Sequence, residues 1–73
     1  MPSDLDQMRR DPGSVQRRAL VAALRDGGFE LVRTHGKHEV WAKGATVIAV
    51  PRTLKATGTI RRIVEIIIAE RED

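Results

Sequence analysis

The chain contains no cysteine and no tyrosine, and its only aromatic side chains are Phe29 and Trp41. Without cysteine the protein has no disulfide bonds and no thiolate metal ligands, which fits a reducing compartment. Nucleic-acid binding by serial base stacking uses several exposed rings, so that mode is poorly supported. No apolar run approaches the roughly 18 residues that span a bilayer, and the N-terminus lacks the apolar segment of a signal peptide. These absences predict a cytoplasmic protein that does not enter a membrane.

The charge of the chain is unevenly distributed. The 73 residues carry 13 basic and 10 acidic side chains, for a net charge of +3. Between residues 33 and 62, however, seven basic residues face a single acid, Glu39. A concentration of this kind attracts phosphates and speeds encounters with nucleic acid. The alternative is a solvated basic face that only maintains solubility. The seven are Arg33, Lys37, Lys43, Arg52, Lys55, Arg61 and Arg62.

The first third of the chain predicts an arm followed by a helix. Residues 1–13 contain Pro2, Pro12 and mixed charges without apolar periodicity, which indicates a mobile N-terminal arm. Ser14 is a favourable N-cap, and apolar residues recur at helical spacing after it, so a helix is expected over residues 15–26. Two glycines that follow end this helix, because glycine takes the left-handed conformation of a helix C-terminus.

The middle of the chain predicts three short strands. They are expected at residues 29–34, 38–42 and 46–50, separated by turns at Gly36 and Gly44, and tight turns make neighbouring strands antiparallel. Pro51 lacks a donor for the sheet and ends the third strand. Because Trp41 and His38 fall on opposite faces of the second strand, Trp41 is expected in the core or in an interface.

A second helix is expected from Thr57 onward, with an apolar stripe at i, i+3, i+4, i+7 and i+8. A strand over residues 60–68 is the less favoured alternative, since Arg61, Arg62 and Glu65 break the alternation. Ile66 lies outside the stripe and is a candidate contact for a partner. The stripe consists of Ile60, Ile63, Val64, Ile67 and Ile68.

These elements predict one α+β domain over residues 14–73, an α-β-β-β-α two-layer sandwich with both helices on one face of a three-stranded antiparallel sheet. The domain is small, since a chain of this length buries only about 60% of its unfolded surface. Stabilisation by a partner is therefore expected.

Four short motifs follow one another along the chain: Gly28-Phe29, Gly36-Lys37-His38, Val50-Pro51-Arg52 and Gly58-Thr59-Ile60. In this order and spacing they make the chain resemble the HicA family of ribonuclease toxins. The resemblance extends from about residue 20 to residue 68, and it implies a fold like that of the double-stranded-RNA-binding domain. The family usually has serine after the turn glycine, whereas this chain has Lys37, a difference that bears on substrate preference.

The resemblance implies that His38 is the catalytic residue, on a hairpin whose turn is made by Gly36. Imidazole suits proton transfer because its unperturbed pKa is about 6.5. An exposed turn histidine without a task is the alternative for any lone histidine. Arg33, Lys37 and Arg52 are candidate RNA-binding residues, because cations near the scissile phosphate stabilise transition-state charge.

His35 lies close to His38 along the chain and is a candidate for phosphate binding. Two histidines with Glu39 could suggest a metal site, but no other carboxylate or cysteine lies nearby. We therefore expect a mechanism without metal and without a cofactor. Lys43 and Lys55 are expected to be ordinary surface cations.

The resemblance implies mRNA as substrate and a HicB-type antitoxin protein as partner. Two other functions are compatible with the same residues. One is a non-catalytic RNA-binding module that holds structured RNA by shape and backbone contacts. The other is a small structural subunit whose basic patch docks on an acidic protein. A weak homo-oligomer is a further partnership that the sequence leaves open.

Overall fold

Helices precede and follow a three-stranded sheet in the chain. The computed structural model describes residues 5–71. Its elements are α1 (Leu5–Arg10), the 3-10 helix η1 (Pro12–Ser14), α2 (Arg17–Asp26), β1 (Glu30–His35), β2 (His38–Lys43), β3 (Thr46–Pro51) and α3 (Thr57–Arg71).

The sheet is antiparallel with the order β1-β2-β3, as the sequence predicts. Each hairpin has a two-residue turn that begins with glycine: Gly36 has φ 60° and Gly44 has φ 58°, and no other residue type takes a positive φ in the described chain. A positive φ at the first central residue of the turn, but not at the second, is typical of a type II′ turn, whose twist matches that of the strands it joins. The glycines therefore set the register of both hairpins.

A bulge in β1 decides which side chains reach each face of the sheet. Leu31 pairs with Trp41 and Arg33 with Val40, so Val32 is an extra residue without a partner in β2. Because the side chains of a strand alternate between the two faces of the sheet, one inserted residue moves every later side chain of that strand to the opposite face. Arg33 consequently shares a face with Val40.

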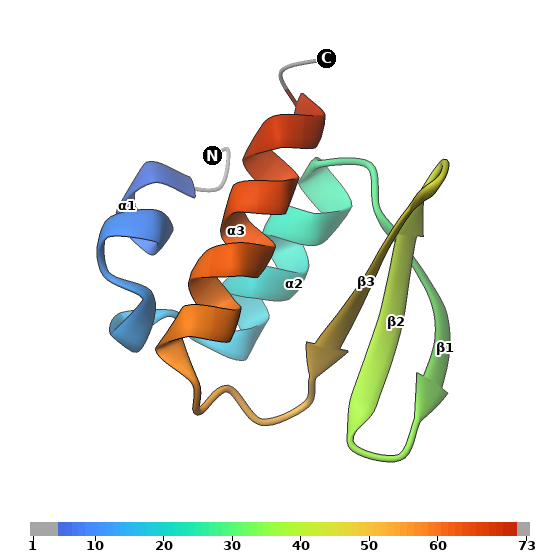
Figure 1. Cartoon of the computed structure of the whole chain (residues 1–73), viewed down its shortest axis with the longest axis horizontal. Coiled ribbons are helices and arrows are strands. Elements are labelled where there is room, and N and C mark those ends of the chain that lie inside the picture. The colour runs from blue at the N-terminus through green and yellow to red at the C-terminus, as the bar shows by residue number, and fades with distance from the viewer. Residues whose placement is uncertain (1–4, 72–73) are drawn as a thin grey trace.

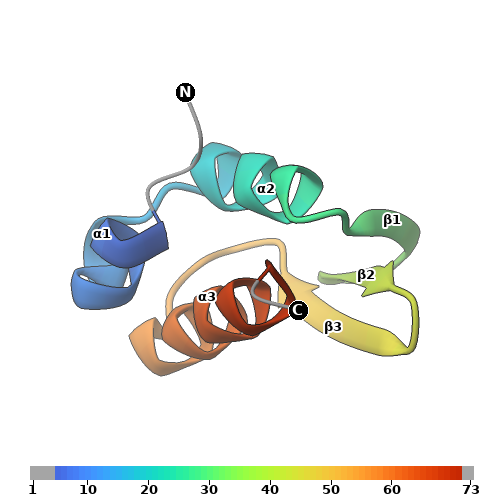
Figure 2. The ribbon, with the colours of Figure 1, turned by 90° about the horizontal axis from the view of Figure 1, so that it is seen from above.

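Both α2 and α3 cover one face of the sheet, as Figures 1 and 2 show. The covered face carries the buried residues Trp41, Ile48 and Val50. Trp41, 1% exposed, is the largest of the fully buried side chains. The core joins both helices to the sheet and consists of Leu5, Met8, Leu20, Ala23, Leu24, Phe29, Trp41, Ile48, Val50, Ile60, Ile63, Val64 and Ile67. The opposite face, called here the outer face, is left uncovered by these two helices.

The apolar stripe of α3 packs into this core as predicted, with Ile60, Ile63, Val64 and Ile67 buried. Ile68 is only partly buried. Ile66, expected to be available to a partner, is also partly buried and packs against the core. β-Branched residues have modest helix propensity, so the length of α3 depends on this burial.

The N-terminal segment differs from the expected mobile arm. Residues 1–4 lie outside the described residues, but from Leu5 the chain is helical and α1 packs against α3. Leu5 and Met8 are spaced i, i+3 and both are buried, which is an apolar periodicity too short to stand out in a polar segment. An isolated helix of this length is unstable in water, so packing must hold it in place.

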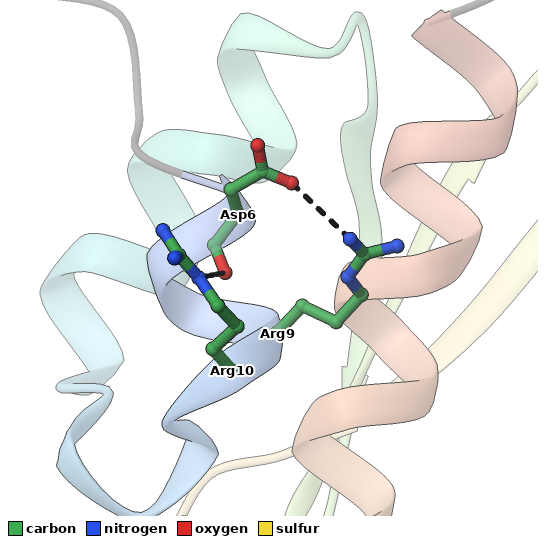
Figure 3. Close-up of polar contacts among 3 residues, drawn as sticks. All are labelled: Asp6, Arg9 and Arg10. Atoms are coloured by element: carbon green, nitrogen blue, oxygen red, sulfur yellow. Dashed lines mark hydrogen bonds and ion pairs between the residues drawn. The ribbon is translucent and has the colours of Figure 1, made fainter.

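Polar contacts among the side chains and backbone of α1 also stabilise this helix. A guanidinium nitrogen of Arg9 lies 3.4 Å from Asp6 Oδ1, and Arg10 Nε donates to the Asp6 carbonyl at 3.3 Å (Figure 3). The acid is in the first turn and both arginines are in the last turn, an order that complements the helix dipole. These exposed contacts are worth little individually.

Ser14 does not cap the following helix as predicted. It ends η1, where its hydroxyl hydrogen-bonds to Asp11 at both the carbonyl oxygen (3.1 Å) and Oδ2 (2.8 Å). α2 begins at Arg17, later than expected, and Gln16 at its N-cap makes no side-chain capping bond. The C-terminal end agrees with the prediction, since the helix ends at Asp26, Gly27 is its C-cap and Gly28 then takes φ 91°.

The predicted α+β class is thus confirmed, with three antiparallel strands in one open sheet and the α-β-β-β-α order. The additional helix α1 precedes this unit. Lys43 and Thr46 connect the second hairpin to the end of α3: Lys43 Nζ donates to the Glu70 carbonyl at 3.2 Å, and Thr46 Oγ1 donates to the Glu70 carboxylate at 2.7 Å.

Candidate functional site

A hollow open to solvent lies where four segments meet at one end of the sheet. The start of α2, the β1–β2 turn, the end of β3 and the loop that leads into α3 all reach this end of the molecule (Figure 1). The hollow is lined by Arg17, Gly36, Lys37, His38, Pro51, Arg52, Thr53 and Lys55.

Backbone contacts fix the walls of the hollow. His38 is the first residue of β2 and pairs with His35 on one side and Pro51 on the other. The Arg52 N–H donates to the Lys37 carbonyl at 2.8 Å and so joins the loop after β3 to the hairpin turn. The left-handed Gly36 has no atom within 4 Å of where a Cβ would stand, so a larger residue there would be strained by its backbone alone.

His38 is exposed and lines the hollow. Strand alternation places it on the outer face, opposite to the buried neighbours Glu39 and Trp41. The imidazole can therefore meet a ligand without opening the core. Either ring nitrogen can accept or donate a proton there.

The lining is strongly cationic. Lys37, Arg52, Lys55 and Arg17 contribute four basic side chains, and within residues 5–71 no aspartate or glutamate lines the hollow. A concave surface of one sign concentrates the field and attracts anions. The arrangement can hold a phosphate group beside an imidazole.

Beneath this lining, a buried acid anchors Arg17. Glu39 is 8% exposed; its Oε2 lies 2.5 Å from Arg17 Nη2, and its Oε1 accepts from Trp41 Nε1 at 3.2 Å. The hydrogen bond from Arg17 lowers the pKa of Glu39, burial acts in the opposite direction, and the hydrogen bond from Trp41 and the charges of Arg17 and Arg52 lower it further. The Arg25 guanidinium lies 5.4 Å from the centre of the Trp41 ring, which connects this network to the last turn of α2.

The lowered pKa of Glu39 predicts acid-sensitive stability. The folded state binds this proton less readily than the unfolded chain, so the stabilisation is fully present above the unfolded pKa of about 4.3 and is lost as pH falls through the lower folded pKa. We expect Glu39→Gln to lower the free energy of unfolding most near neutral pH, and the difference from wild type to shrink below about pH 4. Urea unfolding across this range measures both curves. Parallel curves would show that the ionised Glu39 contributes no pH-dependent stability.

The hollow gathers part of the residue set that the sequence predicts. His38, Lys37, Arg52 and Gly36 line it together. Arg33 and His35 do not, but the bulge in β1 brings both to the outer face, where His35 pairs with His38. Both are exposed.

The sequence does not predict two of the lining residues. Lys55, expected to be an ordinary surface cation, lies in the loop that forms one wall. No sequence pattern marks Arg17, because it is 22 positions from its partner Glu39 and belongs to no motif. The available signal was indirect: Glu39 alternates with Trp41 on the core-facing side of a strand, and a buried acid requires a partner.

Within residues 5–71, no three His, Asp or Glu side chains gather in a way that could hold a metal ion. No helix in the same range is long and apolar enough to cross a membrane.

Comparison with protein-family models, with curated proteins and with solved structures found no match to this chain. The resemblance to HicA toxins therefore depends on the four motifs alone and stays a prediction.

Proposed function

We propose that this chain is a metal-independent ribonuclease toxin of HicA type, which cleaves mRNA in the cytoplasm through His38 and is neutralised by a HicB-type antitoxin. The observation that carries the proposal is the hollow itself, in which one exposed imidazole lies among four basic side chains. Imidazole supplies proton transfer, and the cations stabilise charge on the phosphate as the transition state forms.

The reaction we propose is transfer of the phosphate to the neighbouring ribose oxygen. A base removes the 2′-hydroxyl proton, the 2′-oxygen attacks phosphorus, and the 5′-oxygen leaves with a proton from an acid. The products are a 2′,3′-cyclic phosphate and a 5′-hydroxyl end. His38 is assigned one of the two proton transfers, and Lys37 and Arg52 are assigned to the phosphate oxygens.

The outer face suggests how the RNA strand extends away from the hollow. Arg33 and His35 are exposed on this face, next to His38, because of the bulge in β1. Contacts from these residues to flanking phosphates would add affinity that falls steeply with salt. Arg33 and His35 are therefore assigned to RNA binding outside the hollow.

The test is the chemistry of the products. Purified protein incubated with single-stranded RNA in excess chelator is expected to yield fragments with 2′,3′-cyclic phosphate and 5′-hydroxyl ends. The same sequence made with 2′-deoxyribose is expected to stay intact, because it lacks the nucleophile. Cleavage that needs a divalent cation, or that leaves 5′-phosphate ends, would contradict this mechanism.

Binding of RNA without cleavage is the second candidate. It is favoured by the fact that His38 is the only imidazole among the residues lining the hollow, so that the partner in acid–base catalysis must be a lysine or water. In that case both RNA and its 2′-deoxy counterpart would bind and stay intact in the incubation above.

The proposed antitoxin contact follows from charge. A hollow with four basic residues is complemented by an acidic segment, which would also speed capture of the toxin. In a complex with an inhibitory partner encoded beside this gene, we expect the His38 imidazole to be protected from modification by diethyl pyrocarbonate. Full modification of His38 in an inhibited complex would instead indicate inhibition through another face.

A further inference from the structure

Arg17 makes only part of the contacts that its side chain can form. Its Nη2 pairs with Glu39 Oε2, whereas Nη1 is buried and has no hydrogen-bond acceptor among the described residues. The side chain as a whole is 35% exposed and lines the hollow that contains His38. A guanidinium has five donors in a planar fork, so one ion pair with a single carboxylate oxygen leaves most of them unused.

The acid that holds Arg17 is itself fixed. Its second oxygen accepts from the indole of Trp41, which is fully buried between α2 and the sheet. Each carboxylate oxygen of Glu39 therefore already has one contact, and Nη1 of Arg17 receives none from either oxygen. Glu39 positions Arg17 at the wall of the hollow but does not accept a hydrogen bond from its Nη1.

We propose that Arg17 is a phosphate-binding residue of the hollow. A small outward rotation about its contact with Glu39 would present Nη1 to an oxygen of a phosphate held near Lys37 and Arg52. An unsatisfied buried donor is unfavourable, so an anionic acceptor gains more here than at a solvated arginine. The identity of the ligand as an RNA phosphate rests on the function proposed above, whereas the phosphate-binding site itself does not require cleavage.

The proposal and a purely structural role for Arg17 predict opposite results for Glu39→Gln. Removing the carboxylate makes the hollow more positive, and electrostatics alone would then strengthen anion binding. The amide replaces one of the two oxygens with an N–H2 donor, so only one of the positions that face Arg17 and Trp41 keeps an acceptor and Arg17 is held less firmly. We expect Glu39→Gln to bind phosphate groups more weakly than wild type despite the added charge.

The test uses an all-2′-deoxy oligonucleotide that cannot be cleaved, titrated at low salt into full-length protein carrying His38→Ala. We expect Arg17→Lys in this background to weaken binding about tenfold, because lysine keeps the charge but loses the fork. Arg18→Lys, the adjacent exposed arginine, is the matched control and should change affinity by about twofold or less. Equal binding by Arg17→Lys, or equal or tighter binding by Glu39→Gln, would overturn the proposal.

A second measurement keeps Arg17 and Glu39 unchanged, so its result does not depend on whether the variants at these positions fold. In the His38→Ala protein, the NMR signals of the Arg17 guanidinium N–H groups should shift on titration with the same oligonucleotide, and those of Arg18 should not. Unmoved Arg17 signals at saturation overturn the proposal. Because no step of this test involves cleavage, its result stands whether or not the ribonuclease assignment survives.

Discussion

His38→Ala is expected to lower the rate of RNA cleavage by about 10²–10⁴-fold, the usual contribution of one positioned acid or base. His38 is exposed and lines the hollow, so its removal should change the free energy of unfolding by less than about 0.5 kcal/mol. Cleavage of a fluorescent RNA in chelator measures the rate, and urea unfolding checks the fold.

His35 provides the matched control, since it is an exposed histidine directly opposite His38 in the same hairpin. His35→Ala should lower the cleavage rate less than tenfold, through loss of a phosphate contact rather than of proton transfer. If both variants lose activity equally, the two imidazoles act together, and the assignment of a single catalytic histidine is wrong. Full activity in His38→Ala would remove the main residue from the proposed function.

The sheet and α3 could be predicted because their signals are local. Gly36 and Gly44 each begin a two-residue turn, and such turns fix strand direction and register within a few residues. The stripe of α3 repeats often enough along one helix to show its period and its buried face. Neither inference required knowledge of distant parts of the chain.

α1 could not be predicted in the same way, because its stability comes from a distant partner. Only Leu5 and Met8 mark its buried face, and both are buried against elements that include α3. Charged residues around them give the segment the composition of a disordered arm. Packing against distant residues stabilises α1 despite that composition, and the local sequence alone does not reveal such packing.

The site shows the same division between local and distant signals. Lys37 and His38 follow directly from the turn motif, and Arg52 follows from the end of β3. Arg17 reaches the hollow only because α2 crosses the same end of the sheet, and Arg33 reaches the outer face only because of the bulge at Val32. A pattern of alternating residues without that bulge would place Arg33 on the covered face.

Trp41 connects the core to this site, and Trp41→Ala is expected to lower the free energy of unfolding by about 3–5 kcal/mol. The indole is 1% exposed, packs between α2 and the sheet, and donates to Glu39. Stabilities of natural domains begin at about 5 kcal/mol, so at that lower limit the variant should keep a free energy of unfolding of only about 0–2 kcal/mol. Far-UV circular dichroism during urea unfolding measures this, because the substitution removes the only tryptophan fluorophore.

Trp41→Phe separates the two roles of the indole. Phenylalanine keeps most of the buried apolar surface but cannot donate to Glu39, so we expect a loss of about 1–3 kcal/mol from the smaller ring and the unsatisfied carboxylate oxygen. The folded fraction of this variant should still bind RNA more weakly, since Glu39 no longer holds Arg17 firmly. Val47→Ala, at a position that is 63% exposed, is the control and should cost less than about 0.5 kcal/mol. If Trp41→Ala unfolds no more easily than this control, Trp41 does not hold the helices on the sheet, and the anchor inferred for Arg17 loses its support.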